Sequence, residues 1–283
     1  MNYPNLLAEL GALANLFCGT NKLTVVAGKP GSGWSIDLLT GVISADSLDL
    51  ELRHPDFCRG LICHEIGHHL LTRSHLLFPK EDRSPAHHAL LNVLEDVRLE
   101  NYISKKFPGV SPWIKMFNDE LIQVSSPDIA ERLADDAVGS FLHGVIHRVW
   151  SGTVPEGFHP DGKAAVEEVW PSVERILNLH PPIEAPLDAT PWEAAYKATD
   201  LPLIFSAEDA VSPPDAMEMA VRLAQLSVWQ ETFTHILPVY NRLLARHPFK
   251  ERMDFGGILV IIGPDGRKIA QIPPGQIHSL DDL

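Results

Sequence analysis

The chain has 283 residues, which is long enough to bury a substantial core and to form one large domain or two smaller ones. Its 23 Lys and Arg residues against 37 Asp and Glu residues give a formal charge of -14, which argues against binding the phosphate backbone of nucleic acids. The three cysteines, Cys18, Cys58 and Cys63, lack CxxC spacing, so the sequence predicts neither a disulfide framework nor a cysteine zinc site.

The cellular setting that fits this cysteine usage is the reduced cytoplasm. Residues 1–20 do not resemble a signal peptide, because they have no basic start and include Asn2, Pro4 and Glu9. No later run approaches the roughly 20 apolar residues needed to cross a bilayer. We therefore expect a cytoplasmic protein without nucleic-acid or membrane partners.

The first elements along the chain are a helix and a small sheet. Leucines and alanines at helical spacing predict a helix over residues 4–17. The period then changes, and short β-type runs separated by Gly, Ser and Pro occupy residues 22–45. We expect these runs to form a small antiparallel sheet.

The remainder of the chain is dominated by helical patterns. Helices are predicted near residues 57–73, 85–106, 128–150, 163–178 and 214–246. Pro238 should kink or divide the last of these.

The chain is predicted to end in a β-hairpin that turns at residues 264–266, with the sequence Pro-Asp-Gly. The fold class is therefore α+β and mostly helical. We expect one main domain over residues 1–252, followed by a C-terminal hairpin and tail over residues 253–283.

The stretch from Cys63 to Thr72, CHEIGHHLLT, contains an HExxH motif. Residues four apart lie on the same face of a helix, so His64 and His68 can both direct an imidazole nitrogen at one ion. Glu65 follows the first histidine and could reach a water molecule on the metal without binding the metal itself. Zinc lowers the pKa of such a water toward ~7, and a neighbouring carboxylate can accept its proton.

The motif by itself does not decide between a zinc site and an ordinary helix. A chain of this composition, with its 14 histidines, would contain HExxH by chance in roughly one case in twenty-five. Ile62, Ile66 and Leu70 form a separate apolar stripe that would seat the helix in the core. Gly60 and Gly67 would allow another backbone to approach closely, at about 1 kcal/mol of helix propensity each.

A catalytic zinc usually has three protein ligands and keeps its fourth position for water. The best candidate for the third ligand lies in NVLEDVRLE, residues 92–100, on a helix that Ser84 could cap. Glu95 lies on its apolar face and is expected to point inward, whereas Asp96 lies on a more polar face. We prefer Glu95 and keep Asp96 as the alternative. The other carboxylate could orient a ligand histidine, and Arg98 could pair with a carboxylate.

These two blocks together resemble the zincin-like metallopeptidase domain of CobT-like and phage-encoded peptidases. The first block matches at His64, Glu65, Gly67, His68 and Thr72. The second matches at Asn92, Glu95, Asp96, Arg98 and Glu100. The resemblance covers residues 55–105 and implies a gluzincin-type site with Glu95 as the third zinc ligand.

The resemblance also has a departure. Many such proteins continue into a von Willebrand A-type domain, and the residues after Met253 are too few to form one. This weakens a role as a chelatase subunit and favours a stand-alone, phage-related peptidase. In zincins an edge strand ahead of the zinc helix pairs with the substrate, so residues 41–45 are a candidate for that strand.

Other features have a structural interpretation beside a functional one. His143 and His147 are also four apart, but their apolar neighbours favour a buried helix over a second metal site. Tyr102, His87 and His88 compete with them as stabilisers of a developing oxyanion.

Two further residues are expected to lie in the core. Trp229 is predicted to pack there, with a partner surface as the alternative. Cys63 is expected to be a small buried residue and not a metal ligand.

The sequence thus predicts a zinc metalloendopeptidase acting on a protein or peptide substrate. His64, His68 and Glu95 would bind Zn²⁺, and Glu65 would activate water and pass its proton to the leaving amine. The alternative is a zinc-binding module without proteolytic activity that acts through a protein partner. Glu65 distinguishes the two, because a structural zinc site does not need a base.

Overall fold

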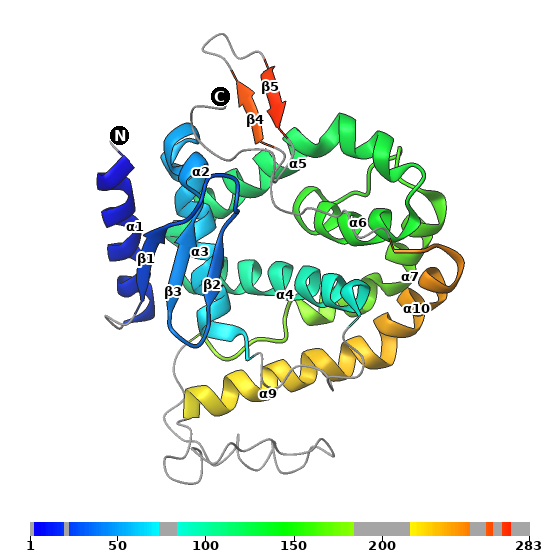
Figure 1. Ribbon diagram of the computed structural model, residues 1–283. Helices are drawn as coiled ribbons and strands as arrows, with labels where there is room; N and C mark the ends of the chain where they lie inside the picture. The colour runs from blue at the N-terminus through cyan, green and yellow to red at the C-terminus, as the bar shows by residue number, and fades with distance from the viewer. Residues whose placement is uncertain are drawn as a thin grey trace. The chain divides into compact units, whose positions relative to one another are not determined.

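The computed structural model shows a mostly helical chain (Figure 1). It describes residues 3–19, 23–73, 84–183, 216–249, 259–262 and 268–272. The predicted majority of helix is confirmed, and the few short strands in this part of the chain are compatible with the predicted α+β class. None of the helices in the described part combines the length and apolar character that crossing a membrane requires.

The chain divides into two compact units, and each is described by itself. The first consists of Met1–Leu70, Phe107–Arg132 and Lys250–Leu283. The second consists of Leu71–Lys106 and Leu133–Phe249.

The first unit contains the helices α1 (Tyr3–Cys18), α2 (Ser47–Leu52), α3 (Pro55–Leu71) and α5 (Ser111–Leu133). The last residues of α3 and α5, Leu71 and Leu133, belong to the second unit. The predicted helix over residues 4–17 corresponds to α1, which buries Leu6, Leu10 and Ala14 on one face. That spacing of four residues is the apolar stripe of a helix packed on one side.

The sheet of the first unit has three strands, drawn as blue arrows in Figure 1: β1 (Thr24–Ala27), β2 (Ser35–Asp37) and β3 (Val42–Ala45). Their order is β1-β3-β2, with β1 parallel to β3 and β2 antiparallel to β3. The prediction of an antiparallel sheet is therefore wrong for one of its two strand pairs.

The β1–β2 connection explains the difference. Neighbouring antiparallel strands are usually joined by a tight turn, but seven residues separate β1 from β2. Asp46 holds this loop by accepting hydrogen bonds from the backbone N–H groups of Gly31 at 3.0 Å and Gly33 at 2.8 Å. β1 and β2 do not pair with each other. Each pairs with β3, so both edges of β3 are occupied by a neighbouring strand. The proposal that residues 41–45 pair with a substrate is therefore wrong, since a strand paired on both sides offers no edge.

The close approach of α3 and α5 fulfils the prediction made for Gly60. A Cβ atom added there would lie 2.5 Å from the carbonyl oxygen of Trp113 and 2.7 Å from Cβ of Phe117. A hydrogen is thus the largest side chain that fits between the two helices. Sequence analysis missed most of α5, because Pro112 and Pro127 within it signal helix breaks.

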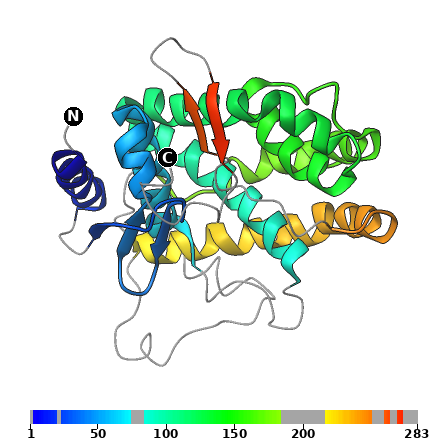
Figure 2. The same cartoon turned by 45° about the horizontal axis from the view of Figure 1, so that its top comes forward.

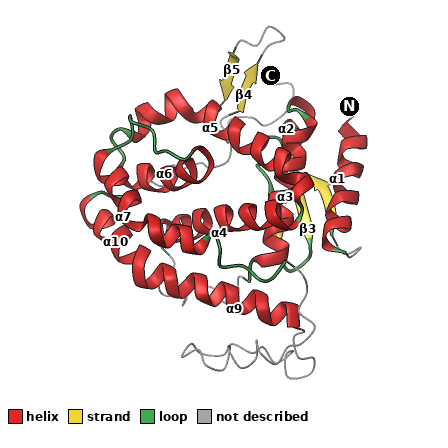
Figure 3. Ribbon diagram, turned by 180° about the vertical axis from the view of Figure 1, so that it is seen from behind, coloured by secondary structure: helices red, strands yellow, loops and turns green. Residues whose placement is uncertain are grey.

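The second unit is a set of packed helices, red in Figure 3: α4 (Pro85–Lys106), α6 (Ala137–Ser151), α7 (Pro160–Ile176), α9 (Ala216–Glu231) and α10 (Leu237–Arg246). The predicted helix over residues 128–150 is in fact the end of α5 and most of α6, which begins anew because Asp136 caps it by accepting from the N–H of Gly139. The long helix predicted to break near Pro238 is divided into α9 and α10 by the π-helical segment Thr232–Ile236.

Trp229 lies in the core of the second unit. It is 5% exposed and belongs to an apolar cluster with Met219, Leu223 and Leu226, all on α9. The core interpretation of this tryptophan is confirmed, and its alternative role on a partner surface is not supported.

The C-terminal strands β4 (Leu259–Ile262) and β5 (Lys268–Ile272) pair antiparallel, with Leu259 opposite Ile272 (Figure 2). This confirms the predicted hairpin strands. The predicted turn over residues 264–266 lies outside the described residues.

Candidate metal centre

The HExxH motif lies on α3, which begins two residues before its predicted start. Pro55 occupies the first helical position, where its missing N–H costs nothing, and Asp56 complements the helix dipole in the first turn. Ile62 and Ile66 are fully buried, as the apolar stripe predicted. The motif is thus held on a helix that is seated firmly in the first unit.

His64 and His68 lie together on one face of α3. Their ring centroids are 4.9 Å apart, and a ring nitrogen of one lies within 4.8 Å of a ring nitrogen of the other. Both side chains are half-buried. Two nitrogens bound to one tetrahedral zinc at 2.0–2.1 Å would be separated by about 3.3 Å.

Phe117 of α5 forms one wall beside the histidine pair. Its ring meets the His64 ring edge-on, with centroids 5.9 Å apart. An apolar wall of this kind restricts the rotation of His64 and limits access of water to one side of the ring. The same residue contacts Gly60, so the position of the wall depends on the close packing of α3 and α5.

Glu65 is buried, with 5% of its surface exposed. A buried carboxylate next to a half-buried histidine pair suits a group that exchanges protons within a restricted site. Cys63, on the other side of His64, is also buried, and burial raises the pKa of its thiol to about 12. The thiol therefore stays protonated at neutral pH in the metal-free chain, and the prediction that Cys63 is a small buried residue is confirmed.

Glu95 belongs to α4 in the second unit and points inward, as predicted, with 9% of its surface exposed. The guanidinium of Arg98 forms a two-pronged contact with it: Nε donates to Oε2 at 3.0 Å and Nη2 donates to Oε1 at 2.6 Å. The Thr72 hydroxyl also donates to Oε1, at 2.6 Å. Both oxygens of Glu95 are therefore engaged by donors of the protein, and the predicted pairing of Arg98 with a carboxylate is confirmed.

Asp96 has a different environment on the same helix. It is half-buried, and its Oδ2 accepts a 2.8 Å hydrogen bond from the side-chain amide of Asn92, one turn earlier. Asn92 itself is exposed. This agrees with the prediction that Asp96 lies on the more polar face of α4.

Arg98 is fully buried and connects Glu95 to two further parts of the second unit. Its Nη1 donates to the carbonyl of Leu179 at 3.2 Å, and its Nη2 lies 3.4 Å from Oε1 of Gln225 on α9. The same Gln225 oxygen accepts from the backbone N–H of Arg73. Gln225 is thus shared by α4 and the segment that follows α3.

Arg73 is held by a second carboxylate. Its guanidinium donates to both oxygens of Glu218 on α9, with a shortest distance of 2.6 Å, and Arg222 donates to Glu218 as well. Burial alone would raise the pKa of Glu218, but the hydrogen bonds and charges of the two arginines outweigh it and lower the pKa. Glu218 therefore stays ionised, and the backbone after α3 is anchored by charged groups.

The remaining sequence candidates have mostly structural contacts. His147 of α6 is buried against Phe158, with ring centroids 5.3 Å apart, and burial lowers its pKa. This supports the core interpretation of that histidine. Tyr102 is buried and its hydroxyl accepts from Lys106, while Nε2 of His87 lies 2.9 Å from the side-chain oxygen of Asn241.

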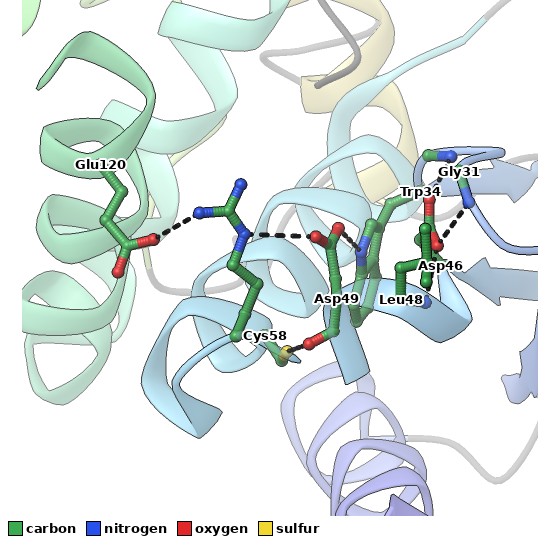
Figure 4. A network of polar contacts seen from close by, with 9 residues as sticks. Gly31, Trp34, Asp46, Leu48, Asp49, Cys58 and Glu120 are labelled. Atoms are coloured by element: carbon green, nitrogen blue, oxygen red, sulfur yellow. Dashed lines mark hydrogen bonds and ion pairs between the residues drawn. The ribbon is translucent and has the colours of Figure 1, made fainter. Parts of the chain in front are cut away.

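A network of polar contacts in the first unit joins α2 to the start of α3, the helix that carries the HExxH motif (Figure 4). Asp49 of α2 accepts from the indole N–H of Trp34 at 2.9 Å and pairs with Arg53, which also reaches Glu120 of α5. The Cys58 thiol of α3 donates to the Asp49 carbonyl. Burial, aided by the charge of Asp46, raises the pKa of Asp49 to about 6. The network joins α2, α3 and α5 around a carboxylate that is costly to ionise.

The candidate residues therefore fall into two groups. His64, Glu65 and His68 are brought together on α3 in the first unit, whereas Glu95 and Asp96 are neighbours on α4 in the second. Sequence reasoning missed the roles of Arg73, Gln225 and Glu218. Arg73 lies 145 positions from Glu218 and 152 positions from Gln225, and no local pattern could have paired it with either.

No family model, curated protein or solved structure matches the chain. Its function therefore has to be argued from its own residues.

Proposed function

We propose that the chain is a zinc-dependent peptidase with a zincin-like site. The observation that carries the proposal is the arrangement on α3, where His64 and His68 present ring nitrogens within 4.8 Å of each other and the buried Glu65 adjoins them. Two imidazoles and a carboxylate are the donor set of many catalytic zinc sites. A carboxylate from α4, Glu95 or Asp96, would complete the set.

When bound at such a site, zinc lowers the pKa of a coordinated water and polarises the substrate carbonyl. The residues of the chain supply the remaining chemistry. Glu65 takes a proton from the attacking water and passes it to the nitrogen of the leaving group. When the peptide bond breaks, that nitrogen therefore leaves as a neutral amine and not as an amide anion. Burial of Glu65 keeps the transferred proton from bulk water.

The test compares wild type with Glu65→Gln and with Glu51→Gln. Glu51 is an exposed glutamate on α2 and serves as a matched control for the loss of one charge. Bound zinc is measured by elemental analysis, and cleavage is measured on a mixed peptide library. We expect Glu65→Gln to retain zinc and lose activity by about 10²- to 10⁴-fold, the usual contribution of a general base. Glu51→Gln should behave like wild type.

The result that would contradict a peptidase is zinc-loaded wild type that cleaves no peptide in the library. That outcome would favour the alternative, a zinc-binding module that acts through a protein partner. A wild type that binds no zinc would contradict both proposals.

A further inference from the structure

The environment of Glu95 bears on which residue of α4 binds the metal. Its carboxylate is buried, and the guanidinium of Arg98 meets it with one N–H on each oxygen. Paired hydrogen bonds of this kind are among the strongest between side chains, because both groups are charged and their shapes match. The Thr72 hydroxyl engages the same carboxylate from another direction.

Binding a dication at Glu95 would conflict with these contacts. The charge of the carboxylate is already balanced by Arg98, which is fully buried and whose guanidinium donates to both oxygens. A metal ion placed on either oxygen would be repelled by that guanidinium at short range and in a medium of low dielectric constant.

Asp96 is in a setting that suits a ligand. It is half-buried, and its Oδ2 accepts a hydrogen bond from the neutral side-chain amide of Asn92. A neutral hydrogen-bond donor orients a carboxylate ligand without cancelling its charge, as the outer contacts of metal sites commonly do.

On the basis of the proposed function, we infer that Asp96 is the carboxylate ligand of the metal and that Glu95 is a positioning residue. Glu95 accepts from Thr72, which directly follows the last residue of α3. Arg73, the next residue, is held by Glu218 and Gln225. Glu95 thus holds α4 to the residues that directly follow α3, within the second unit.

The test measures metal binding in the full chain, without recourse to activity. Asp96→Asn, Glu95→Gln and Thr72→Val are titrated with zinc against a chromophoric chelator, and with Co²⁺, whose visible spectrum reports the ligands. We expect Asp96→Asn to lose stoichiometric binding and the wild-type cobalt spectrum. Glu95→Gln should keep one equivalent and the spectrum, with an affinity lowered by about 10- to 100-fold, as is typical for residues outside the ligand set.

Thr72→Val distinguishes a positioning role of Glu95 from a role in folding, because it removes only the hydroxyl that donates a hydrogen bond to Glu95. The inference requires it to lower metal affinity in the same direction as Glu95→Gln and to leave the cobalt spectrum unchanged. If Glu95→Gln does not fold by circular dichroism, Thr72→Val and Asp96→Asn decide the question.

The inference is overturned if Glu95→Gln abolishes binding or alters the cobalt spectrum, or if Asp96→Asn binds metal like wild type. Either result would leave the zinc proposal intact, because wild type would still bind the metal. Wild type that binds neither zinc nor cobalt would instead refute the proposed function itself.

Discussion

The Thr72 hydroxyl donates a 2.6 Å hydrogen bond to Oε1 of Glu95, which lies 23 residues later in the chain. The bond links the residue that follows the HExxH helix with the helix that carries the second acidic motif. Thr72 belongs to the sequence block that contains HExxH, and Glu95 belongs to the acidic block over residues 92–100. The contact is a direct hydrogen bond between the two blocks from which a metal site was predicted.

Removing the Thr72 hydroxyl should destabilise the chain. Thr72→Val keeps the size of the side chain but leaves a buried carboxylate short of one donor. A hydrogen bond to a charged group contributes about 1.5–3 kcal/mol, and the partial exposure of Thr72 places the expected loss near the lower value. The free energy of unfolding is measured in urea on the metal-free protein. Thr72→Ser, which keeps the hydroxyl, should lose much less, and an equal loss in both variants would contradict this role.

Substitution of Gly60 should disturb the packing of α3 on α5. The added methyl group of Gly60→Ala would lie 2.5 Å from the Trp113 carbonyl, closer than atoms can approach without a backbone shift. We expect a net loss of about 1–3 kcal/mol in the free energy of unfolding, the usual cost of overpacking.

Gly11→Ala is the matched control, because Gly11 also lies within a helix but a Cβ there would meet nothing within 4 Å. That variant should gain up to about 1 kcal/mol from helix propensity. Equal effects in the two variants would show that the backbone approach at Gly60 is not close in solution.

The buried carboxylate of Asp49 should make stability depend on pH. Its pKa is raised from 3.8 to about 6, so between these values the folded chain holds a proton that the unfolded chain has released. The stability contributed by this proton is complete below pH 3.8 and is lost as the pH rises through 6.

Asp49→Asn removes this titration while its side-chain oxygen can still accept from Trp34. As the pH rises from roughly 4.5 to 7.5, wild type should lose stability that the variant keeps. The difference between the two free energies of unfolding should therefore shift by about 2 kcal/mol in favour of the variant across this range. Urea unfolding of both proteins across this range measures the difference. A difference that is constant with pH would show that Asp49 has an ordinary pKa.

Zinc should stabilise the folded chain if the proposed site is correct. At free zinc about 100-fold above its dissociation constant, the free energy of unfolding should rise by about 2.7 kcal/mol, and chelation should reverse the gain. His68→Ala should abolish the gain, whereas His235→Ala, an exposed histidine on the π-helical segment, should retain it. Thermal unfolding with zinc and with chelator measures both, and an equal zinc effect in the two variants would contradict the site.

Much of the local structure could be predicted from the sequence. The helices α1, α3, α4 and α7, the division near Pro238 and the C-terminal strands follow from hydrophobic period and from proline and glycine signals. The inward orientation of Glu95 followed from its apolar neighbours on one helical face. Arg98 was expected to pair with a carboxylate, and it pairs with Glu95 on the same helix. These features depend on residues within one or two helical turns of each other.

The error in the order of the strands arose because segments outside the sheet contribute to it. The place of β3 between β1 and β2 depends on a loop that Asp46 holds from beyond the sheet, so the order of the strands could not be inferred from their alternation. Asp49 has a raised pKa only because α2, α3 and α5 pack around it.

The sequence by itself determined that His64, Glu65 and His68 share a helix, because helical spacing is a local property. Only the tertiary structure decided that Glu95 accepts a hydrogen bond from Thr72, and that Gln225 and Glu218 anchor the segment after α3. Hydrogen bonds between groups far apart in the chain exist only after folding has placed their donors and acceptors within about 3 Å, and no local pattern encodes that placement.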